Sequence, residues 1–166
     1  MPALETATVA PSAAENLLLT QSRTVRAPRA KVYEAWTDPQ IMRLWFGSST
    51  MECTSASLDP RVGGTYRLEL TRKPGVVPKD ASGQGRTSSV ATGRYTKVVP
   101  NELLQFTWSP DFSPAEDSLV TISLKDTPDG TEITVRHEKF LNEASRDAHN
   151  TGWANGLAQL EKVLAG

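Results

Sequence analysis

The sequence lacks several features that define large classes of protein. Among its 166 residues Cys53 is the only cysteine, which excludes an intramolecular disulfide and a Cys-x-x-Cys metal or redox site. No apolar run approaches the about 20 residues that a membrane-spanning helix needs, and the N-terminus lacks the basic and apolar regions of a signal peptide. We therefore expect a cytoplasmic protein that does not insert into a membrane.

An excess of charge of either sign is also lacking. The 18 lysine and arginine residues nearly balance the 19 aspartate and glutamate residues, so the overall field does not favour nucleic acid or an anionic membrane as a partner. The densest basic cluster consists of Arg23, Arg26, Arg29 and Lys31. Because no aromatic side chains interleave these residues to stack on bases, we expect a solvated face and no nucleic-acid partner.

Motifs for metal binding and nucleophilic catalysis are missing as well. Only two histidines occur, His137 and His149, and neither has acidic residues beside it at a ligand spacing. No Gly-x-Ser-x-Gly elbow presents a nucleophile, and Gly83-x-Gly85 lacks the third glycine of a phosphate-binding loop. We expect no metal site and no cofactor, and the sequence identifies no catalytic residue.

The N-terminal part of the chain predicts a strand followed by two short helices. Strand character runs over 17–25, and Pro28 then opens a helix, because proline is tolerated in a first turn. Asp38 and Pro39 end this helix and cap a second one, which Gly47 ends. The apolar faces of the two helices are expected at Val32, Ala35 and Trp36 and at Ile41, Leu44 and Trp45.

From Met51 onward, apolar and polar residues alternate with the period of two that is typical of strands. Each strand then has one apolar face, which suits an antiparallel sheet covered on one side. Asp129 and Gly130 form a strong hairpin signal, whereas residues 73–86, rich in proline and glycine, predict a long connection that suits a pocket rim or lid. The inward positions are expected at Tyr66, Leu68, Leu70, Leu104, Phe106, Trp108, Val120, Ile122, Leu124, Ile133 and Val135.

The last predicted element is a long amphipathic helix over 144–164. Its apolar residues recur at steps of three and four and therefore share one face. Gly152 and Gly156 lie beside that face, where each glycine costs about 1 kcal/mol relative to alanine. Close packing on the sheet would offset this cost, as would space for a guest molecule beneath the helix. The face consists of His149, Trp153, Leu157, Leu160 and Leu164.

The order of these elements predicts an α+β fold. A curved antiparallel sheet of about seven strands that wraps around the C-terminal helix buries all the apolar faces together. The length suits one domain with a sizeable core, which we place at 16–166. Residues 1–15, rich in alanine, threonine, proline and serine, are expected to form a flexible leader.

Aromatic residues from both helical regions and from the sheet are the best indication of a binding site. The predicted fold brings many of them toward one volume, and a ligand pocket is mostly apolar with a few polar anchors. Both histidines are expected to face inward, either as anchors or acid-base groups or as structural residues. Core packing is the alternative for each aromatic side chain. The predicted ligand-binding residues are Trp36, Trp45, Tyr66, Tyr95, Phe106, Trp108, His137, His149, Trp153 and Gly156, with Arg94 as a further anchor.

Five short motifs occur in an order that resembles a known family. They are the segment from Ala27-Pro28 to Asp38-Pro39, Trp45, the segment from Asp59 to Tyr66, Val99-Pro100, and Gly152-Trp153. Over residues 17–165 the chain resembles the Hsp90 ATPase activator homologue (AHSA1-like) family of the START-like, Bet v 1-like (SRPBCC) superfamily. The resemblance implies a helix-grip fold with a cavity between the sheet and the C-terminal helix. In many superfamily members this cavity holds a lipid, hormone, polyketide or other apolar molecule.

The leading functional prediction is the binding of an apolar or aromatic small molecule, a lipid or metabolite, in that cavity. One alternative is a cavity enzyme of the cyclase, dehydratase or hydrolase type that uses a histidine as acid or base. Another is a protein-interaction domain related to stress or chaperones. We expect no direct contact with Hsp90, because the sequence lacks the separate N-terminal domain by which the eukaryotic co-chaperone engages it. The sequence leaves open whether a reaction is catalysed and whether the protein forms a homodimer.

Overall fold

The computed structural model describes residues 17–48, 50–75, 88–112 and 117–165 of the chain. The predicted leader at 1–15 lies outside these residues, as does most of the predicted connection at 73–86. In the described part, the elements follow the predicted order of one strand, two short helices, six strands and a long helix.

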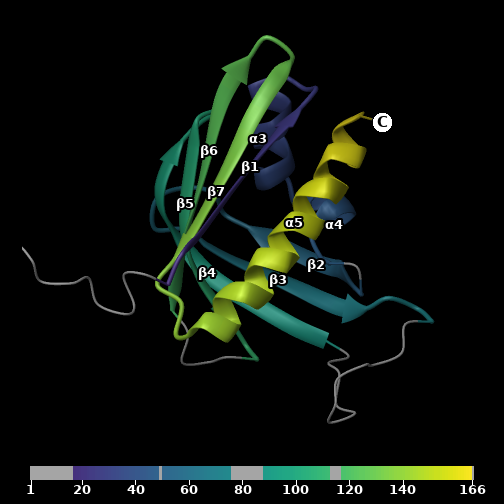
Figure 1. Ribbon diagram of the computed structural model, residues 1–166, viewed down its shortest axis with the longest axis vertical. Helices are drawn as coiled ribbons and strands as arrows, with labels where there is room; N and C mark the ends of the chain where they lie inside the picture. The colour runs from purple at the N-terminus through teal and green to yellow at the C-terminus, as the bar shows by residue number, and fades with distance from the viewer. Residues whose placement is uncertain (1–16, 49, 76–87, 113–116, 166) are drawn as a thin grey trace, which may run out of the picture.

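The described strands form one antiparallel sheet in the order β1-β7-β6-β5-β4-β3-β2. The first strand pairs with the last, and every other pair joins strands that are consecutive in the sequence. Figure 1 shows that the sheet is strongly curled, with β1, β6 and β7 turned away from β2, β3 and β4. The bounds are β1 (Leu19–Val25), β2 (Met51–Leu58), β3 (Thr65–Arg72), β4 (Ser88–Val99), β5 (Leu103–Pro110), β6 (Ser118–Thr127) and β7 (Gly130–Glu138).

The alternation of apolar residues explains which face of the sheet is covered. Of the predicted inward positions, Leu70 is partly buried and all the others are buried. The pairing register shifts between Cys53 and Ser55 in β2 and between Tyr95 and Lys97 in β4. Such shifts are typical of β-bulges, which bend and twist a strand, and they accompany the curl of the sheet. The predicted curved antiparallel sheet is confirmed.

Two short helices, α3 (Arg29–Thr37) and α4 (Pro39–Trp45), follow the first strand. Pro28 occupies the N-cap of α3, one position before the first turn that the sequence predicts. Asp38 separates the helices, and its side chain accepts a hydrogen bond from the backbone N–H of Gln40 at 2.8 Å. This cap is the one that the sequence predicts.

The buried face of α4 differs from the prediction. Leu44 is 66% exposed, whereas Met42 is buried. Trp45 fixes the rotation of the helix, because its indole Nε1–H donates to the carbonyl oxygen of Ala35 at 2.9 Å. With 3.6 residues per turn, the residue three before Trp45 shares its face and the residue one before it does not. A tertiary hydrogen bond therefore decides which apolar residues this short helix buries.

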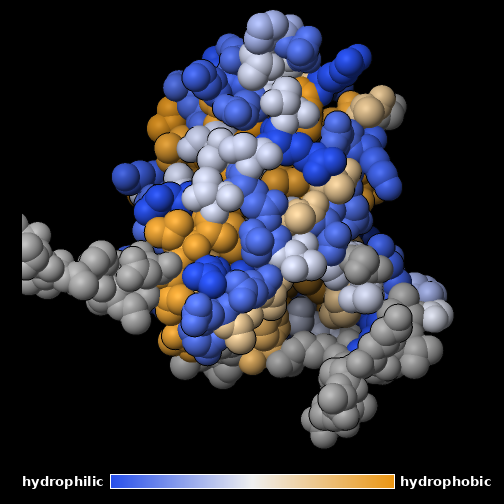
Figure 2. All heavy atoms as spheres, viewed as in Figure 1, coloured by the Kyte–Doolittle hydropathy of each residue, from blue (hydrophilic) through white to orange (hydrophobic). Residues whose placement is uncertain are grey.

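The long helix α5 (Glu143–Ala165) crosses the concave side of the sheet (Figure 1). Its buried residues are Trp153, Gly156, Leu157 and Leu160, while His149 and Leu164 at the two ends of the predicted stripe are only partly buried. Figure 2 shows mainly hydrophilic side chains along the outer side of this helix. Two polar contacts join it to β1, from Gln21 to Asn150 and from Arg23 to Glu161.

The glycines of α5 make no close backbone approach. A Cβ atom at Gly152 would meet nothing within 4 Å, and at Gly156 the nearest atom would be the carbonyl oxygen of Gly47 at 3.6 Å. At 3.6 Å, a Cβ atom at Gly156 would make an ordinary van der Waals contact with this oxygen. Close packing therefore does not offset the free-energy cost of either glycine in the helix. This is contrary to the expectation that close packing on the sheet would do so.

Candidate functional site

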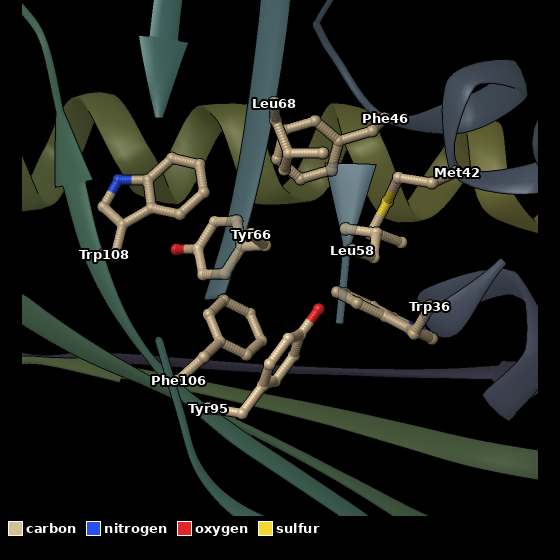
Figure 3. A pocket seen from close by; sticks show the side chains of 9 residues that line it. All are labelled: Trp36, Met42, Phe46, Leu58, Tyr66, Leu68, Tyr95, Phe106 and Trp108. Carbon is tan, nitrogen blue, oxygen red and sulfur yellow. The ribbon is translucent and has the colours of Figure 1, made fainter. Parts of the chain in front are cut away.

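A small pocket lies on the concave side of the sheet where β2 to β5 face α3 and the end of α4 (Figure 3). Its free volume is about 10 Å³, which is close to the minimum that holds one water molecule. The lining consists of Trp36, Met42, Phe46, Leu58, Tyr66, Leu68, Tyr95, Phe106 and Trp108. None of these residues belongs to α5, so the helix expected to roof the cavity does not line this pocket.

Three aromatic rings from adjacent strands form the floor of the pocket. The ring centroids of Tyr66 and Phe106 are 5.3 Å apart at an interplanar angle of 80°. Tyr95 lies 6.0 Å from Phe106 and 5.7 Å from Tyr66. These distances and steep angles are typical of favourable edge-to-face aromatic packing, so the pocket has a well-packed floor.

Gly93 provides the space in which Tyr66 lies. The two residues are paired across β3 and β4, and the Tyr66 hydroxyl donates to the carbonyl oxygen of Thr107 at 2.5 Å. A Cβ atom at Gly93 would collide with that carbonyl and would lie 2.7 Å from the Tyr66 hydroxyl. Burial, followed by the neighbouring Tyr95, raises the pKa of Tyr66, so its hydroxyl stays protonated and keeps this hydrogen bond.

The glycine-rich turn before β3 holds Tyr95 in place. The backbone N–H of Gly63 donates to the Tyr95 carbonyl at 2.9 Å, and the Tyr95 N–H donates to the Gly64 carbonyl at 2.9 Å. Gly63 has a φ of 87°, a conformation that side chains disfavour. The segment from Asp59 to Tyr66, which the sequence marks as a motif, therefore anchors a pocket residue of β4.

The Tyr95 hydroxyl has no hydrogen-bond partner among the described residues. Figure 3 shows it pointing into the pocket, toward Trp36 and Leu58. Burial, with smaller effects of Tyr33 and Asp59, raises the pKa of this hydroxyl. It is therefore a neutral hydrogen-bond donor at physiological pH.

Trp36 connects the pocket to the aromatic core beneath α5. Its ring lies 4.7 Å from that of Trp45 and 5.9 Å from that of Trp153, and the residue is 2% exposed. The indole Nε1–H of Trp36 is buried and has no acceptor in the described part of the chain. Trp45 and Trp153 lie behind Trp36 and do not line the pocket.

His137 is enclosed between α5 and the sheet and uses both ring nitrogens. The Trp153 Nε1–H donates to His137 Nδ1 at 3.0 Å, which fixes the tautomer because an indole nitrogen can only donate. The proton on His137 Nε2 then faces Ser118 Oγ at 2.7 Å, and Ser118 donates to the Trp108 carbonyl at 3.2 Å. Burial, followed by the nearby His149, lowers the pKa of His137, which keeps the ring neutral.

His149 makes a similar pair with a second tryptophan. The Trp108 Nε1–H donates to His149 Nε2 at 3.1 Å, and His149 Nδ1 donates to the Ser145 carbonyl at 2.8 Å. The two histidine rings lie 5.1 Å apart. We call the linked groups the histidine–tryptophan network, which comprises Trp108, Ser118, His137, His149 and Trp153.

The structure brings five of the predicted site residues into the pocket lining, namely Trp36, Tyr66, Tyr95, Phe106 and Trp108. Both histidines belong to the network instead, and Gly156 packs near Trp45. Arg94 is exposed. Four lining residues are not among the predicted site residues, and of these only Leu68 has a clear signal in the sequence, since it continues the alternation of Tyr66. The other three are Met42, Phe46 and Leu58.

The described residues show neither a metal centre nor a transmembrane helix. No group of three or more histidine, cysteine or acidic residues among them lies in an arrangement that would hold a metal ion. No helix among them is both long and apolar enough to cross a membrane.

Known proteins resemble this chain in sequence and in fold. The sequence model of the family described as Activator of Hsp90 ATPase homolog 1-like protein matches residues 26–165. No curated protein matches the chain. Protein CV1439 from Chromobacterium violaceum is 25% identical, with a TM-score of 0.77 over 91% of this chain and 99% of that one.

Two further structures are more distant in sequence and show the fold alone. The AHSA1-like protein from Aeromonas hydrophila is 20% identical, with a TM-score of 0.70 over 89% of this chain and 92% of that one. The AHSA1 (SPO3351) protein from Silicibacter pomeroyi is 19% identical, with a TM-score of 0.73 over 89% of this chain and 97% of that one. Together, the family match and the curled sheet gripping α5 lead to one conclusion: the chain belongs to the Activator of Hsp90 ATPase homolog 1-like family of helix-grip proteins.

Proposed function

We propose that the protein binds an apolar or aromatic small molecule in the pocket beneath α3 and α4. The observation that carries this proposal is the lining itself, in which uncharged aromatic and aliphatic side chains converge from six elements and the segment after α4. A pocket of this composition gains free energy when it buries apolar ligand surface, at about 25 cal/mol per Å² before ordering costs.

Binding requires side chains to move, because the free volume is about 10 Å³. The floor tyrosines and Phe106 are fixed by the sheet, whereas the opposite side contains Met42, an unbranched and adaptable residue. Phe46 and Leu58 are the two lining residues that are only partly buried. We infer that a ligand enters past Phe46 and Leu58 and displaces Met42 while the floor stays in place.

The test is a thermal-shift and tryptophan-fluorescence screen with a library of lipids and aromatic metabolites. A ligand should raise the Tm and change the fluorescence, since Trp36 and Trp108 line the pocket. Leu58→Trp should fill the pocket and abolish the response, whereas Leu164→Trp, at a partly buried site of α5, should preserve it. A folded wild-type protein that responds to no compound would refute the proposal.

The geometry does not favour a cavity enzyme that uses a histidine as acid or base. Neither histidine lines the pocket, and all four ring nitrogens are engaged in hydrogen bonds to protein groups. Proton transfer to a ligand would require one of these hydrogen bonds to break.

A further inference from the structure

One pocket hydroxyl has no hydrogen-bond partner in the described part of the chain. The Tyr95 residue is 3% exposed, its hydroxyl points into the pocket (Figure 3), and no described residue forms a hydrogen bond with it. A hydroxyl that faces a pocket and has no protein partner is available to donate a hydrogen bond to a bound molecule.

The adjacent tyrosine provides an internal comparison. The rings of Tyr66 and Tyr95 are 5.7 Å apart, yet only the Tyr66 hydroxyl reaches a protein acceptor, the Thr107 carbonyl. The indole Nε1–H of Trp36, another lining residue, is buried and has no acceptor among the described residues, and this group can only donate. The unpaired polar groups of the lining residues thus include two donors.

The charges around the pocket restrict the ligand further. None of the lining residues carries a charge, and burial, together with Tyr33 and Asp59, raises the pKa of Tyr95 so that it donates as a neutral phenol. An ionised group placed here would lose its hydration without gaining a counter-charge. The site therefore suits an uncharged acceptor and disfavours a carboxylate or phosphate.

We propose that this pocket selects neutral apolar molecules that carry a hydrogen-bond acceptor oxygen, as in a ketone, aldehyde, ester or ether, and that this oxygen accepts the Tyr95 hydroxyl proton in a hydrogen bond. The inference rests on the proposed function and narrows its ligand class. The bound oxygen completes the hydrogen bonding of a site that the protein leaves open.

The test uses two probes of nearly the same shape in calorimetric titrations. Acetophenone carries a carbonyl oxygen where α-methylstyrene carries a methylene group. The wild-type protein should bind acetophenone about five-fold more tightly or better, and Tyr95→Phe should bring the ratio of the two affinities to about one. Leu164→Trp, on α5 and outside the lining, should keep the wild-type ratio. Benzoate, which is ionised at pH 7, should bind more weakly than acetophenone.

The outcomes separate this inference from the proposed function. Equal affinity of the wild-type protein for both neutral probes, or an unchanged preference in Tyr95→Phe, overturns the inference while binding itself persists. Tighter binding of benzoate than of acetophenone overturns the neutral class. Failure of the wild-type protein to bind any probe contradicts both the inference and the proposed function. The wild-type preference needs no variant, so a folding defect in Tyr95→Phe leaves the inference testable.

Discussion

The concave side of the sheet carries two aromatic clusters that differ in how their polar atoms are paired. In the histidine–tryptophan network beneath α5, both histidine rings and both indole N–H groups have partners. In the pocket beneath α3 and α4, the Tyr95 hydroxyl and the Trp36 indole have none among the described residues. The clusters meet at Trp108, which lines the pocket and donates to His149.

The difference separates stability from binding. A fully paired buried network is costly to break, because each lost partner leaves a desolvated polar group. Unpaired donors lower stability until a ligand pairs with them, and local departures from complete pairing are expected at functional sites. We therefore expect substitutions in the network to change folding stability, and substitutions in the pocket to change ligand preference.

The largest effect is expected when the network is broken at its centre. His137→Phe keeps an aromatic ring but removes the acceptor of the Trp153 indole N–H and the partner that His137 Nε2 provides to the Ser118 hydroxyl. We expect a loss of about 2–4 kcal/mol in the free energy of unfolding, measured by urea denaturation. His149→Phe is the matched control and should cost less, because His149 is only partly buried. Equal and small losses would contradict a central role of the network.

A glycine comparison sharpens the contrast between the pocket floor and α5. Gly93→Ala should destabilise the protein by about 1–3 kcal/mol, because the added methyl group collides with the Thr107 carbonyl and crowds the Tyr66 hydroxyl. Gly152→Ala should instead stabilise it by about 0.5–1 kcal/mol, since nothing lies within 4 Å of its Cβ position. Thermal denaturation of both variants measures whether each substitution lowers or raises the Tm. A stabilising Gly93→Ala would mean that Tyr66 packs differently.

The network should also make stability dependent on pH. Burial and the nearby His149 hold the pKa of His137 below its ordinary value, while a histidine in the unfolded chain titrates near about 6.5. As the pH falls below that value, His137 becomes protonated in the unfolded chain but stays neutral in the folded protein. The free energy of unfolding therefore decreases by up to about 1.4 kcal/mol per pH unit.

Urea denaturation at pH 7.5 and pH 5.5 measures this loss. His137→Phe should show a smaller difference between the two pH values than the wild-type protein, because it lacks the group responsible. An identical difference in the two proteins would assign the pH dependence to other groups.

The smallest expected effect distinguishes the two floor tyrosines in the absence of ligand. Tyr66→Phe loses the hydrogen bond to the Thr107 carbonyl and should cost about 1 kcal/mol. Tyr95→Phe removes a hydroxyl with no described partner and should leave the free energy of unfolding unchanged or slightly higher. Chemical denaturation of the pair measures both values, and an equal loss in the two variants would mean that Tyr95 has a protein partner.

Periodicity predicts the sheet and α5 because their buried faces repeat over many residues. Tyr66 and Phe106 fall on the predicted inward face for this reason, and Trp153 on the predicted stripe of the helix. In α4 the pattern is too short to decide between Leu44 and Met42, since the hydrogen bond from Trp45 to Ala35 sets its rotation.

The sequence does not predict how the polar atoms of the site are paired. It places both histidines inward, but whether their nitrogens face a cavity or other side chains depends on tertiary contacts between α5 and strands distant in the sequence. Phe46 lies outside any regular pattern, and the register shift in β2 obscures Leu58. The free Tyr95 hydroxyl follows from the curled sheet and its turn, which local spacing does not encode.

The most direct test of the contrast between the clusters is the ¹⁵N NMR spectrum of the four tryptophan indole N–H groups during titration with acetophenone. We predict a large shift of the Trp36 signal, because Trp36 lines the pocket, and little change for Trp153, whose N–H stays bound to His137. A shift of Trp153 with Trp36 unchanged would place the ligand beneath α5 and contradict the account.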